Sequence, residues 1–196
     1  MNNTHDELIR DITACKRCRL WKFRKNTVPG VGTLHAKVML IGEAPGYHED
    51  MQSMPFVGHA GRILDQLLTR AGLSRGDVYV SNILKCRPPN NQDPTSAEMQ
   101  ACTPYLRRLL NLLRPRLVVA MGRFATTFMA AEAGKQFTSI SKMHGNPFDV
   151  MLRGHRIVVF PTFHPAAALY NPRYQAALDE DFMAMKTIIA EQVFRP

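Results

Sequence analysis

The sequence predicts an α/β protein, a three-layer α/β/α sandwich with a central, mainly parallel sheet of four strands. Short apolar segments bounded by turn residues are typical of buried strands. Longer segments that repeat apolar residues every three or four positions lie between them and predict helices. Strands that alternate with helices form parallel sheets covered on both faces. With 196 residues the chain has the size of one domain, which we expect to span residues 1–196.

Each element follows from its apolar pattern and its ends. Helices are expected at residues 4–14, 59–72, 95–113, 123–133 and 173–194. Thr95 is a candidate N-cap, Glu98 stands where it would complete a capping box, and Gly72 suits the position just after a helix. Strands are expected at residues 37–42, 78–84, 117–121 and 156–160, the last preceded by a hairpin partner at 149–152.

The balance of charge points to a polyanionic partner. The chain has 25 Lys and Arg against 16 Asp and Glu, a formal net charge of +9, and nucleic acid is the commonest partner of such proteins. The basic residues are dispersed, so binding would use a folded surface. No segment approaches the roughly 18 apolar residues of a membrane span, and the polar first residues lack the features of a secretory signal. We expect a cytoplasmic, nucleoid-associated monomer that binds nucleic acid and no membrane.

The whole thiol complement is four cysteines, Cys15, Cys18, Cys86 and Cys102. A C-x-x-C pair completed by two later cysteines is typical of a four-thiolate site for zinc or for an iron–sulfur cluster. The alternatives are two disulfides or four unrelated thiols. A reducing cytosol disfavours disulfides, and the spacing favours a metal site.

Three loops follow predicted strands, at residues 42–57, 85–94 and 161–165. In parallel sheets the carboxyl ends of the strands meet at one edge, and ligands bind in the crevice there. The three loops are therefore expected to converge on one binding site.

The first of these loops carries an aromatic residue and carboxylates. Phe56, between Pro55 and Gly58, either offers a stacking platform for a planar ring or fills the core beneath the loop. Glu43 follows a buried strand, where an unpaired carboxylate is costly, so it should contact backbone amides, water or ligand. Glu49 and Asp50, taken alone, fit a solvated helix start.

One further polar side chain of interest precedes the second loop, and another lies in the third loop. Asn82 lies in an apolar strand, and its amide could pair with the N–H and C=O on one edge of a pyrimidine or could tie down neighbouring backbone. His164, held before a proline, could hydrogen-bond a reacting group or stabilise a developing anion, although a lone histidine is more often structural.

Together these segments resemble the family 4 uracil-DNA glycosylases, the iron–sulfur-containing branch of the uracil glycosylase superfamily. The resemblance runs from about Cys15 to Pro172. The motifs that carry it are Gly42-Glu-Ala-Pro-Gly-x-x-Glu-Asp50, Pro55-Phe-Val-Gly-x-Ala-Gly61, Asn82-x-x-Lys-Cys-Arg-Pro-Pro-Asn-Asn-x-Asp-Pro94 and His164-Pro-Ala-Ala.

The resemblance implies an enzyme that flips uracil out of DNA and hydrolyses its N-glycosidic bond, leaving an abasic site. It implies that Phe56 stacks on the base, that Asn82 reads its edge and that His164 donates to uracil O2 as the bond breaks. It also implies that the four cysteines hold a [4Fe–4S] cluster, in preference to zinc.

Further roles follow from the same resemblance. Glu43 and Glu49 match acidic positions of the pocket: one of them positions the attacking water, and Glu49 also helps to exclude the thymine methyl group. The main chain at Gly42, Glu43 and Ala44 contacts the base. Residues 164–169 resemble the loop that enters the duplex.

One departure is that Ser53-Met54 stands where the family has a glycine, which predicts a stiffer loop. Two other functions remain open: an iron–sulfur DNA-binding module without catalysis, and a glycosylase for another deaminated base such as hypoxanthine. The joint presence of Glu43, Phe56, Asn82 and His164 favours the uracil-releasing enzyme.

Overall fold

The computed structural model describes residues 4–193. Its α-helices are α1 (His5–Thr13), α2 (Tyr47–Gln52), α3 (His59–Arg70), α4 (Ser96–Leu113), α5 (Arg123–Glu132), α6 (Ile140–Met143) and α7 (Pro172–Ile188). Its strands are β1 (Val31–Gly32), β2 (Val38–Gly42), β3 (Val78–Asn82), β4 (Leu117–Met121), β5 (Phe148–Leu152) and β6 (His155–Thr162). Short 3-10 turns are η1 (Arg19–Lys22), η2 (Arg75–Asp77), η3 (Pro89–Asn91) and η4 (Pro165–Leu169), and a π-helical turn, η5 (Ile189–Val193), follows α7.

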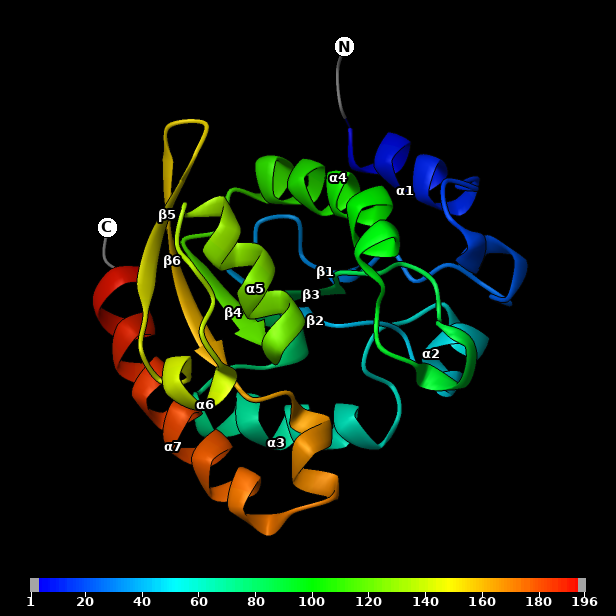
Figure 1. Cartoon of the computed structure of the whole chain (residues 1–196). Helices are drawn as coiled ribbons and strands as arrows, with labels where there is room; N and C mark the ends of the chain where they lie inside the picture. The colour runs from blue at the N-terminus through cyan, green and yellow to red at the C-terminus, as the bar shows by residue number, and fades with distance from the viewer. Residues whose placement is uncertain (1–3, 194–196) are drawn as a thin grey trace.

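The strands form one six-stranded sheet in the order β1-β3-β2-β4-β6-β5 (Figure 1). The expected count of four is wrong for the whole sheet. The central strands β3, β2, β4 and β6 are parallel, whereas β1 and β5 pair antiparallel at the two edges. Two-residue β1 is too short to leave a periodic signal, and β5 adds to the edge as the hairpin partner of β6.

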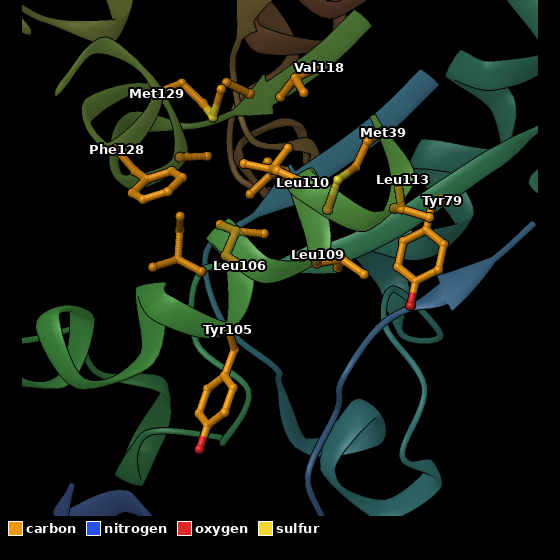
Figure 2. Packing of buried hydrophobic residues seen from close by; sticks show 14 of the residues in the cluster. Met39, Tyr79, Tyr105, Leu106, Leu109, Leu110, Leu113, Val118, Phe128 and Met129 are labelled. Carbon is orange, nitrogen blue, oxygen red and sulfur yellow. The ribbon is translucent and has the colours of Figure 1, made fainter. Parts of the chain in front are cut away.

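Helices cover both faces of the sheet, because successive strand residues point to opposite sides. On β2, Met39 and Ile41 pack into a cluster with α1, α4 and α5, while Val38 and Leu40 pack against α3 and α7. Figure 2 shows the first cluster, where Met39, Tyr79 and Val118 of the sheet meet side chains of α4 and α5. Those helix residues are Tyr105, Leu106, Leu109, Leu110, Leu113, Phe128 and Met129.

Helix α4 begins as the sequence predicts. The Thr95 hydroxyl accepts from the Glu98 N–H, and the Glu98 carboxylate accepts from the Thr95 N–H at 2.9 Å. The Glu98 side chain is buried and also receives Arg19 Nε at 2.8 Å. This pair joins the start of α4 to the turn that follows the first two cysteines.

The first loop contains a short helix, in agreement with the interpretation of Glu49 and Asp50 as a helix start. Residues 42–57 include α2, which lies near the carboxyl edge of the sheet. Asp50 lies in the first turn of this helix, but the expectation that it is solvated is wrong: its side chain is buried and accepts the main-chain N–H groups of Lys25 at 3.0 Å and Asn26 at 3.1 Å. Asp50 therefore fastens α2 to the segment that precedes β1.

Within the described part of the chain, none of the helices combines the length and the apolar character that crossing a membrane would require.

Candidate active site and candidate metal centre

A cleft of about 230 Å³ opens at the carboxyl edge of the sheet, where the three predicted loops meet. It is lined by Glu43, Ala44, Pro45, Gly46, Glu49, Phe56, Ala60, Asn82, Pro88, Asn91, Gln92, His164, Ala166 and Tyr170. Six of the seven residues predicted to bind substrate are in this set. The seventh, Gly42, lies directly against the Phe56 and Asn82 side chains.

Asn82 ends β3 and is almost completely buried, with 1% of its surface exposed. Its Oδ1 is a buried acceptor with no hydrogen-bond partner among the described residues. Buried polar atoms are hydrogen-bonded in the great majority of cases. An unpaired acceptor in a residue that lines a cleft therefore points to a donor supplied by a ligand. A Cβ at Gly42 would collide with this oxygen, so only glycine keeps the approach open.

Phe56 is held in a strained conformation beside Asn82. Its φ is +54°, a left-handed value that is uncommon outside glycine. Its carbonyl accepts from the Arg75 guanidinium at 2.9 Å, and α3 presses close enough at Gly61 that a Cβ there would collide with the same carbonyl. Strain that the surroundings enforce in this way is typical of functional sites. Ser53, the residue just after α2, also has a left-handed φ of 57°.

His164 follows β6 and begins the turn η4. Its Nδ1 accepts the main-chain N–H of Ala166 at 3.2 Å. Burial lowers the pKa of His164 to about 4, and the nearby Glu49 carboxylate opposes this shift only in part. The imidazole is therefore neutral at pH 7, and because Nδ1 accepts, the ring proton lies on Nε2.

Glu43 follows β2 and also lines the cleft. Burial, with a smaller contribution from the Asp93 carboxylate, raises the pKa of Glu43 to about 7 against the opposing effect of Arg123. Arg123 and Asp93 themselves form an ion pair. A carboxyl group with a pKa near neutrality can hold or release a proton at working pH, as a general base must.

Glu49 lies in the first turn of α2 and lines the cleft, and its carboxylate is bonded to main chain as well as being partly open to solvent. Its carboxylate accepts three main-chain N–H groups, from Gly46 at 3.1 Å, Val57 at 3.0 Å and Gly58 at 2.9 Å. These bonds close the first loop on both sides of Phe56. Most of the hydrogen-bonding capacity of Glu49 is thus spent on the loop, although the side chain also lines the cleft.

The four cysteines, distant in sequence, line one pocket between α1 and α4. All four thiols are free, Cys86 and Cys102 are buried, and Cys15 and Cys18 are partly exposed. Apolar side chains, among them Ile12, complete the pocket. Among the described residues, no three Cys, His, Asp or Glu side chains stand close enough together to hold a single metal ion.

The donors around the sulfur atoms suit thiolates. Arg24 donates to Cys86 Sγ at 3.1 Å, and the main-chain N–H of Lys85 donates to Cys102 Sγ at 3.3 Å. Burial raises the pKa of Cys102 to about 12, so this thiol is no reactive nucleophile, and a bound metal would have to displace its proton. Four sulfurs with N–H donors aimed at them fit a thiolate-ligated iron–sulfur centre.

Comparison with known proteins identifies the family. The sequence profile of the uracil DNA glycosylase superfamily matches residues 29–186. The type-4 uracil-DNA glycosylase of Saccharolobus solfataricus is 45% identical over 188 residues, which make up 95% of this chain and 87% of the relative. This chain belongs to the uracil DNA glycosylase superfamily, in its type-4 branch. The type-4 enzyme of Archaeoglobus fulgidus is 44% identical over 177 residues, covering 90% of this chain and 89% of that relative. The type-5 uracil-DNA glycosylase of Thermus thermophilus is 33% identical over 172 residues, covering 71% and 78%.

Sequence reasoning missed two residues of this superfamily member that support its cleft. Arg75 holds the Phe56 carbonyl and pairs with Asp65 at 2.6 Å. Lys85 is buried between Asn82 and the cysteine pocket. Arg75 lies in a polar turn that has the pattern of an exposed loop. Lys85 had one available signal, because a lysine directly after an apolar strand is costly to bury unless it is paired.

Proposed function

We propose that this protein removes uracil from DNA by hydrolysing the N-glycosidic bond and leaving an abasic site. The observation that supports this most is that Asn82, with its orphan acceptor, lies with Phe56 and His164 on one cleft of a type-4 family member. A base inside a duplex is out of reach of such a cleft, so it must be flipped out, at a cost of about a few kcal/mol.

Asn82 would read the base. Its Oδ1 would accept from uracil N3–H, and its amide NH₂ would donate to O4. Cytosine offers an unprotonated N3 and an amino group at these places and would leave the buried amide unpaired. Sites built to hydrogen-bond a substrate reject such analogues strongly. Phe56 would stack on the face of the base.

The bond between C1′ and N1 breaks with its electron pair going to uracil, so negative charge grows on the base. The His164 Nε2–H would donate to O2, where that charge develops. A preorganised donor at this position stabilises the transition state more than the ground state. Glu43, as the carboxylate, would orient the water that adds to C1′ and accept its proton. Glu49 would keep the Phe56 loop closed around the base, where it also limits room for a thymine methyl group. The main chain at residues 42–44 would complete the contacts.

We further propose that Cys15, Cys18, Cys86 and Cys102 hold a [4Fe–4S] cluster. When bound, the cluster would join the N-terminal turn, the loop after β3 and helix α4, a structural role, since glycosidic hydrolysis transfers no electron. Uracil-containing DNA is the proposed partner, held in part by the net charge of +9. The proposed form is a single-domain monomer in the cytoplasm, associated with the nucleoid.

The test is release of base from otherwise identical oligonucleotides that carry one uracil, hypoxanthine or thymine. We expect release of uracil only. Asn82→Ala and His164→Ala should each lower the single-turnover rate by about 10²–10³-fold, as removal of one transition-state donor does. Lys37→Met is the matched control, because Lys37 is exposed and precedes β2 at the opposite edge of the sheet. DNA binding without release of any base would instead identify a binding module, and preferred release of hypoxanthine would identify a different glycosylase.

A further inference from the structure

A buried lysine joins the base-reading residue to the cysteine pocket. Lys85 is 1% exposed. Lysine is almost never buried to this degree without partners, because its charge loses hydration and its long side chain loses freedom. The position of its partners therefore indicates what its burial achieves.

The Lys85 ammonium reaches back along its own chain to the end of β3. Nζ donates to the main-chain oxygen of Asn82 at 2.6 Å and to Ser81 Oγ at 2.6 Å. Ser81 Oγ in turn donates to the Pro29 carbonyl at 2.8 Å. The three groups form a buried chain from Lys85 to the segment that leads into β1, and both Ser81 and Asn82 are themselves buried.

The Asn82 carbonyl needs a side-chain donor because the edge strand β1 does not continue far enough to offer a main-chain N–H opposite it. β1 pairs Val31 with Val80, and continuing that register sets Pro29 opposite Asn82. Proline has no N–H to donate. Lys85 Nζ supplies the donor that the neighbouring backbone lacks, so the Asn82 carbonyl is fixed by a side chain.

The same residue is anchored at the cysteine pocket. Its main-chain N–H donates to Cys102 Sγ at 3.3 Å, and its carbonyl accepts from the Val28 N–H at 2.8 Å. It immediately precedes Cys86 and lines the pocket. The negative charge of bound thiolates would face the buried ammonium.

We propose that Lys85 is a positioning residue for uracil recognition, holding the Asn82 backbone in register with the cysteine pocket. This inference rests on the proposed function and extends it, since it links a site for a structural metal centre to the base-reading amide. Lys85 is not among the residues that line the cleft. It acts by keeping the Asn82 amide where its orphan oxygen meets the ligand.

The test is Lys85→Met, which removes the ammonium donors and keeps a linear side chain of similar length. The main-chain N–H that donates to Cys102 is unchanged. We expect the single-turnover rate of uracil release to fall about 10–100-fold, the loss expected when a reacting group is displaced by about 1 Å. The dissociation constant for DNA should stay within about twofold of the wild-type value, because phosphate contacts dominate affinity. Iron content and visible absorption should be retained. Lys37→Met, which exchanges an exposed lysine at the far edge, should match the wild type in every measurement.

A double mutant separates positioning from general destabilisation. If Lys85 acts through Asn82, adding Lys85→Met to Asn82→Ala should lower the rate no further than about twofold. The inhibition constant for free uracil should likewise rise in each single variant. The two increases should not add in the double variant. A merely structural role would reduce the folded fraction by the same factor in both backgrounds.

The inference is overturned if Lys85→Met releases uracil at the wild-type rate, or if its loss is undiminished in the Asn82→Ala background. Should Lys85→Met fail to fold, Ser81→Ala supports the same comparison, because it removes the hydroxyl that Lys85 shares with Pro29; a rate equal to the wild type then overturns the inference. Absence of uracil release by the wild-type protein in the same assay would contradict the proposed function instead, so the two failures are distinct.

Discussion

The rings of Phe56 and His164, which are distant in sequence, stack on each other with centroids 5.5 Å apart and planes inclined by 25°. The His164 ring thus lies against the aromatic face that the proposed mechanism gives to uracil. In that mechanism the base would take this face, and His164 would meet the edge of the base, where its Nε2–H would donate to O2. The two residues are therefore coupled before any ligand arrives.

Replacing Phe56 by Ala should lower kcat/KM for uracil release by about 5–150-fold. The reason is the loss of base–aromatic stacking, which is worth about 1–3 kcal/mol per base. Phe23→Ala, which removes an exposed ring outside the cleft, is the matched control and should stay near the wild-type value. Single-turnover release from a uracil oligonucleotide measures both, and a wild-type rate in Phe56→Ala would refute the stacking role.

The pH dependence of activity should report Glu43 rather than His164. The pKa of Glu43 is raised to about 7 and its carboxylate is the active form, so kcat/KM should rise as pH increases through about 7. The pKa of His164 is lowered to about 4 and its neutral form is the donor, so His164 is already active across this range.

The control for that assignment is Glu43→Gln, which keeps the shape of the side chain. It should lower the rate and remove the rise near pH 7 in a profile measured from pH 5 to 9. An unchanged rise in Glu43→Gln would assign the ionisation to another group.

The sequence predicts the parallel core and the convergence of the three loops for one physical reason. Carboxyl ends of parallel strands share an edge, so Asn82 at the end of β3 and His164 just after β6 lie at the same edge of the sheet, where both line the cleft. The features that the sequence did not reveal depend on contacts between distant segments. Asp50 carries the pattern of a surface residue, yet two N–H groups from another loop make its burial favourable. The backbone strain at Phe56 likewise depends on Arg75 and α3, and no local pattern encodes it.

Gly61→Ala should destabilise the active site even though Gly61 lies within helix α3. Helix propensity alone favours alanine over glycine by up to about 1 kcal/mol. Here the added Cβ would collide with the Phe56 carbonyl, so either the helix or the strained loop must shift. We expect a fall in uracil release of at least about tenfold, together with a lower melting temperature.

Gly76→Ala is the matched control for that prediction. The nearest atom to a Cβ at Gly76 is Ser74 Oγ at 3.5 Å, an ordinary contact, and the residue has no left-handed φ. Its activity and melting temperature should resemble those of the wild type. Equal behaviour of the two alanine variants would show that the close approach at Gly61 has no role in holding Phe56.

Loss of one cysteine should cost both the metal centre and stability. Cys102 lies on α4, whereas Cys15 and Cys18 follow α1, so a centre held by all of them would cross-link the two helices. Removal of a structural metal is among the few changes that cost more than about 4 kcal/mol, which corresponds to roughly 8–16 °C in the melting temperature of a protein this size. Cys102→Ala should therefore lose iron, visible absorption and thermal stability together.

Ala101→Ser, which adds a hydroxyl beside the pocket without removing a sulfur, should keep all three. Cys102→Ala protein that retained the wild-type iron content would exclude Cys102 as a ligand, and with it the cross-link between α1 and α4.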